Sequence, residues 1–91
     1  MTDPIDNPAQ SRFELHMGSD VAIAAYELSG STMTFTHTEV PKHLEGQGVG
    51  STLAAYALDQ ARARHLTVVP RCPFIHDFIT KHPEYQELVK K

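Results

Sequence analysis

The sequence has little cysteine and no long apolar run. Its 91 residues include one cysteine, Cys72, so no internal disulfide can form, and the paired cysteines of zinc-binding motifs are absent. No apolar stretch approaches the roughly 20 residues of a membrane-spanning helix. Met1–Gln10 lacks the apolar segment of a signal peptide. We therefore expect a cytoplasmic protein with no membrane partner.

Positive charge is also scarce. Eight Lys and Arg residues stand against 11 Asp and Glu, which gives a net charge of -3. The phosphate backbone of nucleic acid selects basic faces, so we expect no nucleic-acid partner. An anionic ligand would have to be held by local backbone geometry. The histidines are scattered without metal-ligand spacing, and we expect no metal.

The hydrophobic pattern predicts three strands followed by alternating helices and strands. Polar, proline-containing residues 1–11 predict a flexible tail, and residues 12–91 a single domain. Alternating apolar residues predict strands over Arg12–Met17, Val21–Ser29 and Thr32–Val40, joined by short glycine turns into an antiparallel meander. In the third strand, this alternation places His37 and Glu39 on the same face as Met33 and Phe35.

The second half of the chain reads as helix, strand, helix. Apolar spacing predicts helices over Val49–His65 and Pro73–Lys81, with Phe74 on the apolar side of the second. Leu66–Val69 predicts a short buried strand, and Pro83–Val89 a closing turn or helix. The order indicates an α+β fold, with helices packed on a sheet.

Three glycines at alternate positions precede the first predicted helix: Gly46, Gly48 and Gly50. Such a helix start leaves backbone N–H groups free to receive phosphate. The Rossmann spacing fails, because Ser51 or Leu53 stands where its last glycine would be. The Walker pattern also fails, since no lysine follows Gly50.

The segment Gln47–Ser51 resembles the acyl-CoA pyrophosphate loop of the GCN5-related N-acetyltransferase superfamily. The segments Thr36–Pro41, Val68–Phe74 and His82–Tyr85 extend the likeness to the small, single-domain branch of that superfamily. The resemblance covers Phe13–Val89 and implies a minimal version of the superfamily fold. One position departs from the signature: Glu45 stands where the superfamily usually has Arg or Gln.

This resemblance implies that acetyl-CoA or CoA binds as a cosubstrate. The pyrophosphate would accept hydrogen bonds from the backbone N–H groups of the loop, where a side chain at position 48 or 50 would crowd it. The pantetheine arm would pair with the exposed backbone at the end of the third strand. The cofactor-binding residues expected on this basis are Gln47, Gly48, Val49, Gly50 and Ser51 in the loop, and Thr38, Glu39 and Val40 in the strand.

The resemblance also implies acyl transfer to an amine, which needs an acid for the leaving thiolate and a base for the amine. The tyrosine that often supplies this acid in larger members falls at Phe78 or Ile79 here. Cys72, at a helix start that favours the thiolate, is the candidate acid or acyl acceptor, or else a buried small hydrophobe. His37 is the candidate base, or else a strand histidine satisfied by a neighbour such as Glu39.

Three functions therefore remain open on the sequence. The first is an acyl-CoA-dependent N-acyltransferase, with acetyl transfer to a small-molecule or peptidic amine. The second is a non-catalytic acyl-CoA-binding or CoA-binding module of the same fold. The third is a structural domain without CoA. For each of them we expect a monomer or a weak homodimer.

Overall fold

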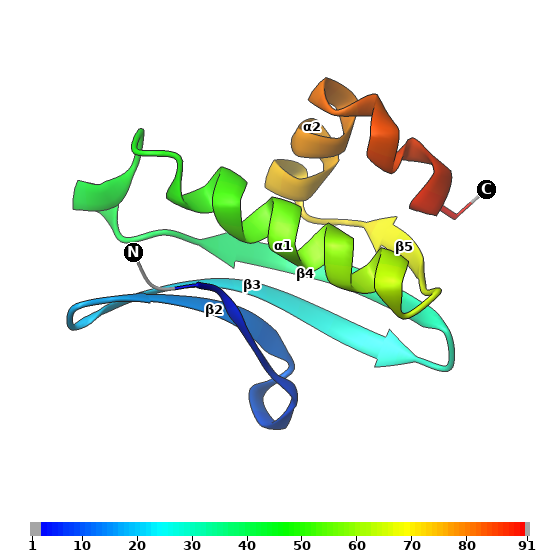
Figure 1. The fold of residues 1–91 in the computed structure, drawn as a ribbon, viewed down its shortest axis with the longest axis horizontal. Coiled ribbons are helices and arrows are strands. Elements are labelled where there is room, and N and C mark those ends of the chain that lie inside the picture. The colour runs from blue at the N-terminus through cyan, green and yellow to red at the C-terminus, as the bar shows by residue number, and fades with distance from the viewer. Residues whose placement is uncertain (1–2, 91) are drawn as a thin grey trace.

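The computed structural model describes residues 3–90. Its strands form one five-stranded sheet in the order β1-β2-β3-β4-β5 (Figure 1). Neighbouring strands from β1 to β4 are antiparallel, whereas β4 and β5 are parallel. The strands are β1 Ile5–Asn7, β2 Arg12–Met17, β3 Asp20–Ser29, β4 Thr32–Glu39 and β5 Thr67–Pro70.

Two α-helices and three short 3-10 segments complete the chain. Helix α1, Val49–Ala63, connects β4 to β5, and helix α2, Pro73–Lys81, follows β5. The 3-10 segments are η1 Pro8–Gln10, η2 Lys42–Leu44 and η3 Pro83–Leu88. This arrangement confirms the predicted α+β class. Among the described residues, no helix combines the length and apolarity needed to cross a bilayer.

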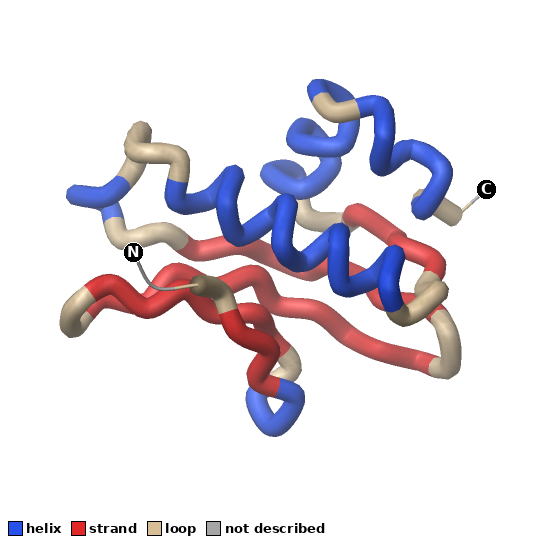
Figure 2. Tube along the Cα trace, in the orientation of Figure 1, coloured by secondary structure: helices blue, strands red, loops and turns tan. Residues whose placement is uncertain are grey.

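Helices α1 and α2 lie over the same face of the sheet, as Figures 1 and 2 show. Helix α1 contacts β2, β3 and β4, and α2 contacts β4 and β5. The buried side of α1 is rich in alanine, which lets the helix lie close to the strands. The largest fully buried side chains are Phe13, Phe35, Leu15, Met33, Leu53, Leu58, Ile75, Val68 and Cys72.

The N-terminal segment differs from the predicted flexible tail. Ile5–Asn7 pairs with β2, and the Asn7 side chain accepts a hydrogen bond from the Gln10 N–H at the start of η1. The Asp6 carboxylate accepts from Tyr26 Oη at 2.7 Å and from Arg64 at 2.7 Å. Polar contacts therefore order a segment in which the apolar pattern predicts no strand. Met1 and Thr2, which also belong to the predicted tail, lie outside the described residues.

Two other boundaries differ from those predicted. Helix α1 ends at Ala63 rather than at His65, because Arg64 caps the helix and His65 adopts a left-handed backbone with φ of 57°. Strand β5 includes Pro70, which pairs with Phe35 at the last position of the β4–β5 ladder. A proline is tolerated there because no further ladder N–H is needed. The predicted bounds of α2 match those observed.

Strand β4 contains a β-bulge that the alternating pattern did not predict. Ala25 pairs with His37 while Tyr26 pairs with Phe35, so Thr36 is an extra residue in β4. The Thr36 hydroxyl donates to the Ala25 carbonyl at 3.4 Å. Because an extra residue reverses the side-chain alternation, the residues after the bulge point to the opposite face from the one expected.

A buried carboxylate lies on the face of the sheet opposite the helices. Glu14 is 4% exposed. Its carboxylate contacts Arg12 Nε at 2.7 Å, His16 Nε2 at 2.8 Å and Asn7 Nδ2 at 2.9 Å. The Arg12 hydrogen bond, followed by those from His16 and Asn7, lowers the pKa of Glu14 from 4.5 to about 2. Glu14 therefore remains ionised in the folded protein well below neutral pH.

Candidate functional site

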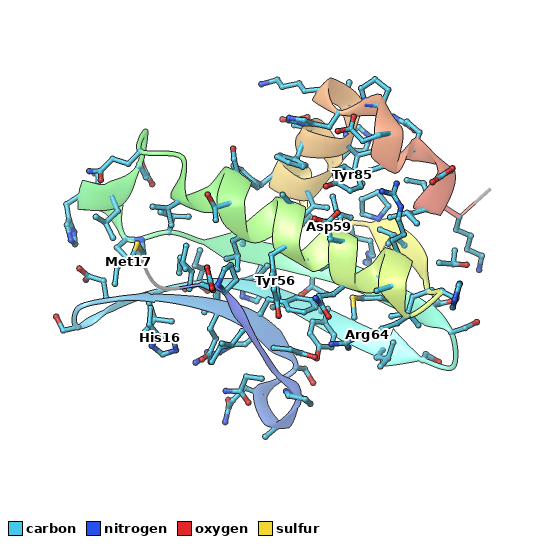
Figure 3. All side chains as sticks on the ribbon, in the orientation of Figure 1. His16, Met17, Tyr56, Asp59, Arg64 and Tyr85 are labelled. Atoms are coloured by element: carbon cyan, nitrogen blue, oxygen red, sulfur yellow. The ribbon has the colours of Figure 1, made fainter. Side chains whose placement is uncertain are left out.

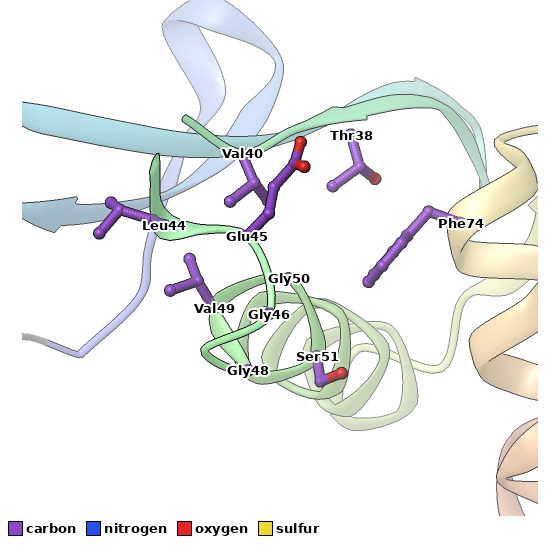
Figure 4. Close-up of a pocket in the computed structure, with 10 residues that line it drawn as sticks. All are labelled: Thr38, Val40, Leu44, Glu45, Gly46, Gly48, Val49, Gly50, Ser51 and Phe74. Carbon is purple, nitrogen blue, oxygen red and sulfur yellow. The ribbon is translucent and has the colours of Figure 1, made fainter. Parts of the chain in front are cut away.

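A pocket of about 450 Å³ lies between the end of β4, the start of α1 and the start of α2 (Figure 4). Its volume falls within the roughly 300–1,000 Å³ range of small-molecule sites. The loop between β4 and α1 forms one wall, and Phe74 of α2 lies at the far side. The lining residues are Thr38, Val40, Leu44, Glu45, Gly46, Gly48, Val49, Gly50, Ser51 and Phe74.

The glycine loop leaves backbone donors free at the pocket. Gly48 is the N-cap of α1 with φ of +80°, a left-handed conformation that favours glycine, and it supplies no side-chain cap. The first hydrogen bond of α1 runs from the Thr52 N–H to the Gly48 carbonyl at 2.9 Å. The preceding N–H groups, those of Val49, Gly50 and Ser51, have no partner within the helix. The loop therefore has the donor set that a pyrophosphate requires.

Gly50 has a second role. Its backbone is helical, so its conformation does not demand glycine. A Cβ at this position would lie 2.7 Å from Cζ of Phe74, closer than any real contact. At Gly48, by contrast, a Cβ would meet nothing within 4 Å. Gly48 is thus favoured by its backbone conformation, and Gly50 by the close approach of the Phe74 ring, whose exposed end would have to shift to admit a methyl group.

The end of β4 offers an open strand edge beside this pocket. Pairing between β4 and β5 stops at Phe35 and Pro70, and the Phe35 carbonyl accepts from the Cys72 N–H at 2.9 Å. After the bulge, Thr38 and Val40 face the helices, as Phe35 does before it. Side-chain direction and N–H direction alternate together along a strand, so these two residues present their backbone groups to the open edge.

His37 and Glu39 lie on the opposite face of β4 from the pocket. The interpretation that placed them on the face of Met33 and Phe35 is wrong, because the bulge at Thr36 reverses the alternation. Both side chains are exposed, and His37 Nε2 lies 3.1 Å from Glu39 Oε2. The structure therefore brings these two residues together but separates their side chains from the pocket.

Cys72 lies directly behind the pocket wall. It is the N-cap of α2 and is 2% exposed. Its sulfur lies 3.2 Å from the Thr38 hydroxyl, and Thr38 lines the pocket. The Cys72 thiol is therefore connected to the pocket indirectly, by its contact with the Thr38 hydroxyl.

Glu45 is the only ionisable side chain among the described lining residues. It is exposed, and Figure 4 shows its side chain rising from the loop toward β4. Gln47, expected at the ligand, is not in the lining; its amide donates to the His43 carbonyl at 3.4 Å. His43 Nε2 in turn lies 2.9 Å from Asp20 Oδ2, and this contact joins the loop to the first residue of β3.

No tyrosine lines the pocket within the described part of the chain. Burial, followed by the hydrogen bond to Asp59, raises the pKa of Tyr85 to about 12, and Figure 3 shows this pair between η3 and α1. Burial and the Asp6 bond raise the pKa of Tyr26 to about 12 as well. Tyr56 packs edge-on against Phe13 in the core.

Sequence reasoning missed Phe74 as part of the site. Its place in the apolar pattern of α2 predicts a core residue, yet it is 40% exposed at the pocket, while Ile75, Phe78 and Ile79 are buried. The available signal was Gly50, because a glycine inside a predicted helix is unfavourable relative to alanine and so indicates a packing or functional reason.

Comparisons with known proteins point in one direction. Residues 12–88 match the family model described as GCN5-related N-acetyl-transferase. The fold is similar to the solution structure of a GCN5-like candidate N-acetyltransferase from Staphylococcus aureus, with a TM-score of 0.75. The two chains share 23% sequence identity, and the match covers 97% of this chain and 87% of the other.

Proposed function

The chain belongs to the GCN5-related N-acetyltransferase family, and on that premise we propose that it is an acyl-CoA-dependent N-acyltransferase whose pocket holds acetyl-CoA. The observation that carries the proposal is the glycine loop. It brings the N–H groups of Val49, Gly50 and Ser51, which have no partner within the helix, to a pocket beside an open strand edge. When bound, acetyl-CoA supplies the activated acyl group.

The cosubstrate would be held mainly by backbone groups. The N–H groups at the start of α1 would bind the pyrophosphate, assisted by the positive end of the helix dipole. Thr38 and Val40 would pair with the pantetheine amides as a further strand would. Gln47 and Glu39 contribute backbone at most, since neither side chain lines the pocket.

The two catalytic candidates would serve opposite sides of β4. As the carbon–sulfur bond breaks, the Thr38 hydroxyl would donate its proton to the leaving sulfur and would be reprotonated by the Cys72 thiol, 3.2 Å away. For an amine that reaches the thioester across the open edge of β4, His37, oriented by Glu39 on the other face, would accept the proton that the amine loses. His37 then releases this proton to solvent, and the buried Cys72 takes one back through the Thr38 hydroxyl, so the cycle balances.

Binding is tested first, by thermal unfolding with saturating CoA or acetyl-CoA. A ligand at 100 times its Kd stabilises the native state by about 2.7 kcal/mol. For a domain of this size that corresponds to a rise in Tm on the order of 10 °C. If neither ligand raises the Tm, the proposal is contradicted, and the remaining function is that of a structural domain that does not bind CoA.

Turnover is tested by CoA thiol release from acetyl-CoA with a panel of small and peptidic amines. Cys72→Ser and His37→Gln should each lower kcat by about 10²-fold or more, the range of general acid–base catalysis. The exposed His76 on α2 provides the matched control, and His76→Gln should leave kcat unchanged.

A second function is favoured by the lining of the pocket itself. Neither Cys72 nor His37 is a lining residue, and among the described residues no tyrosine takes their place. A non-catalytic CoA-binding module would show the rise in Tm with CoA. It would release no thiol with any amine, and the two substitutions would leave the Tm shift intact.

A further inference from the structure

Among the described residues, Phe74 is the one exposed large apolar side chain that lines the pocket. Of the described residues, Ile5, Leu28 and Phe74 are the exposed large hydrophobics, at 48%, 51% and 40%. Ile5 and Leu28 lie on strands outside the pocket. Figure 4 shows the Phe74 ring extending from the start of α2 into the space between Gly50 and Thr38.

The first turn of α1 is shaped to receive this ring. Besides the 2.7 Å approach to Cζ, a Cβ at Gly50 would lie 3.3 Å from both Cε atoms of Phe74. Glycine is among the least favourable residues inside a helix, and nothing in the backbone of Gly50 requires it. The close contact with the ring accounts for its presence.

The ring lies at the end of the pocket nearest the proposed chemistry. Phe74 follows Cys72 by two residues, and the Cys72 sulfur contacts Thr38, which forms the wall beside the ring. Leu44 and Val49 lie toward the other end, whereas Gly50 lies beside the ring. A cosubstrate with its pyrophosphate on the loop and its pantetheine along Thr38 and Val40 would direct its acyl group toward the ring.

We propose that Phe74, seated on Gly50, limits the acyl group that the pocket accepts to short chains. The inference rests on the proposed function, because it assumes that an acyl-CoA occupies the pocket. The ring is a wall that a two-carbon acyl group clears and a longer chain meets. Truncating the ring opens this end, and enlarging it closes it further.

Isothermal titration of CoA, acetyl-CoA, butanoyl-CoA and hexanoyl-CoA tests the inference. Wild type should bind CoA and acetyl-CoA within about threefold of each other, and hexanoyl-CoA at least tenfold more weakly. Phe74→Ala should bring hexanoyl-CoA within about threefold of acetyl-CoA, because the longer chain gains apolar contacts in the opened space. Phe74→Trp should weaken acetyl-CoA relative to CoA. Leu28→Ala, at another exposed apolar position outside the pocket, should leave the wild-type order unchanged.

The outcomes separate the two proposals. If wild type binds neither CoA nor acetyl-CoA, the proposed function fails and this inference fails with it. If CoA binds but wild type accepts hexanoyl-CoA as well as acetyl-CoA, only the inference is overturned. The same holds if Phe74→Ala retains the wild-type ratio, or if it weakens all four ligands equally. Far-UV circular dichroism of Phe74→Ala and Phe74→Leu establishes that the variants are folded, and the leucine variant should show an intermediate ratio.

Discussion

Gly48 and Gly50 differ in what a methyl group would meet at each position. Gly48→Ala should destabilise the protein by about 1–2 kcal/mol, because an L-residue at φ of +80° is strained. Gly50→Ala carries no such strain, and its effect should depend on Phe74. In a Phe74→Ala background, Gly50→Ala should stabilise by about 0.5–1 kcal/mol through helix propensity. In the wild-type background this gain should disappear.

A double-mutant cycle measured by urea unfolding checks this prediction. Positions 50 and 74 should show a coupling of about 1 kcal/mol. Positions 48 and 74 should show none, since a Cβ at Gly48 has open space around it. Equal effects of Gly50→Ala in the two backgrounds would mean that the ring is not seated on Gly50.

Glu14 should control the acid stability of the fold. Its pKa is lowered from 4.5 to about 2, so the unfolded chain binds more protons than the folded one between these values. The stabilisation is therefore fully present above about pH 4.5 and is lost as the pH falls through about 2. Glu14→Gln should destabilise the protein by about 1–2 kcal/mol at neutral pH.

Urea unfolding of wild type and Glu14→Gln across this pH range measures the effect. The difference in unfolding free energy should be constant at neutral pH and should shrink toward zero near pH 2. A difference that stays the same down to pH 2 would show that the folded-state carboxyl is not held ionised by Arg12, His16 and Asn7.

Single residues of the site were predictable where local backbone chemistry decides them. The alternating glycines indicate an anion-binding helix start, and six residues of that loop line the pocket, from Glu45 to Ser51 without Gln47. Phe74 was not predictable from the pattern of α2, because its position in that pattern equals that of a core residue. Only the packing of α2 against α1 leaves its ring at the pocket.

Among the elements, β1 depends on one carboxylate. Asp6 receives the Tyr26 hydroxyl and Arg64 at 2.7 Å each, and so joins β1 to β3 and to the end of α1. Asp6→Ala should destabilise the protein by about 1–3 kcal/mol, because it leaves the Tyr26 hydroxyl without this partner. It should also speed hydrogen exchange in residues 5–7. Asp3→Ala, at an exposed neighbouring position, is the control and should change neither quantity.

Strands and helices were predictable from periodicity, and the departures have local causes. The meander, both helices and β5 were expected nearly at their observed bounds. The bulge was not, since Thr36 is one threonine among several in β4 and an extra residue leaves no mark in such a run. It therefore reversed the predicted faces of His37 and Thr38. Strand β1 was not predicted, because polar contacts hold it in place and the prediction relied on apolar residues.

Charge acts on the proposed ligand at the scale of the whole molecule. The chain carries a net charge of -3, and the described pocket lining contains a carboxylate, Glu45, with no cation to balance it. CoA is itself an anion. In sites where lysine or arginine side chains bind its phosphates, the affinity for CoA falls as ionic strength rises, and we expect no such fall here. Raising the ionic strength from about 0.01 to 1 M shortens the Debye length from roughly 30 to 3 Å.

Glu45→Gln should strengthen CoA binding by about fivefold at low salt, equivalent to about 1 kcal/mol. This advantage should shrink at high salt, because screening weakens the repulsion in wild type. Titrations of both proteins at the two ionic strengths give the result. An affinity of wild type that drops steeply with salt would show instead that lysine or arginine side chains hold the phosphates.

The architecture as a whole was predictable because pattern and resemblance agreed on it. The pocket was only partly predictable, since its walls come from segments far apart in the chain. Thr38 and Cys72, 34 positions apart, meet because β4 and β5 separate after Phe35 and Pro70. Nothing local to either residue specifies that meeting; it follows from the parallel pairing that α1 makes possible.

The bulge at Thr36 reverses the side-chain alternation between the two halves of β4. Before it, odd-numbered side chains such as Met33 and Phe35 build the core; after it, even-numbered ones such as Thr38 and Val40 line the pocket. A combinatorial library can therefore diversify the pocket at even-numbered positions after the bulge while leaving the core residues before the bulge unchanged. Deleting Thr36 would restore the regular alternation. The side chains of His37 and Glu39 would then face the pocket, and those of Thr38 and Val40 would face away from it.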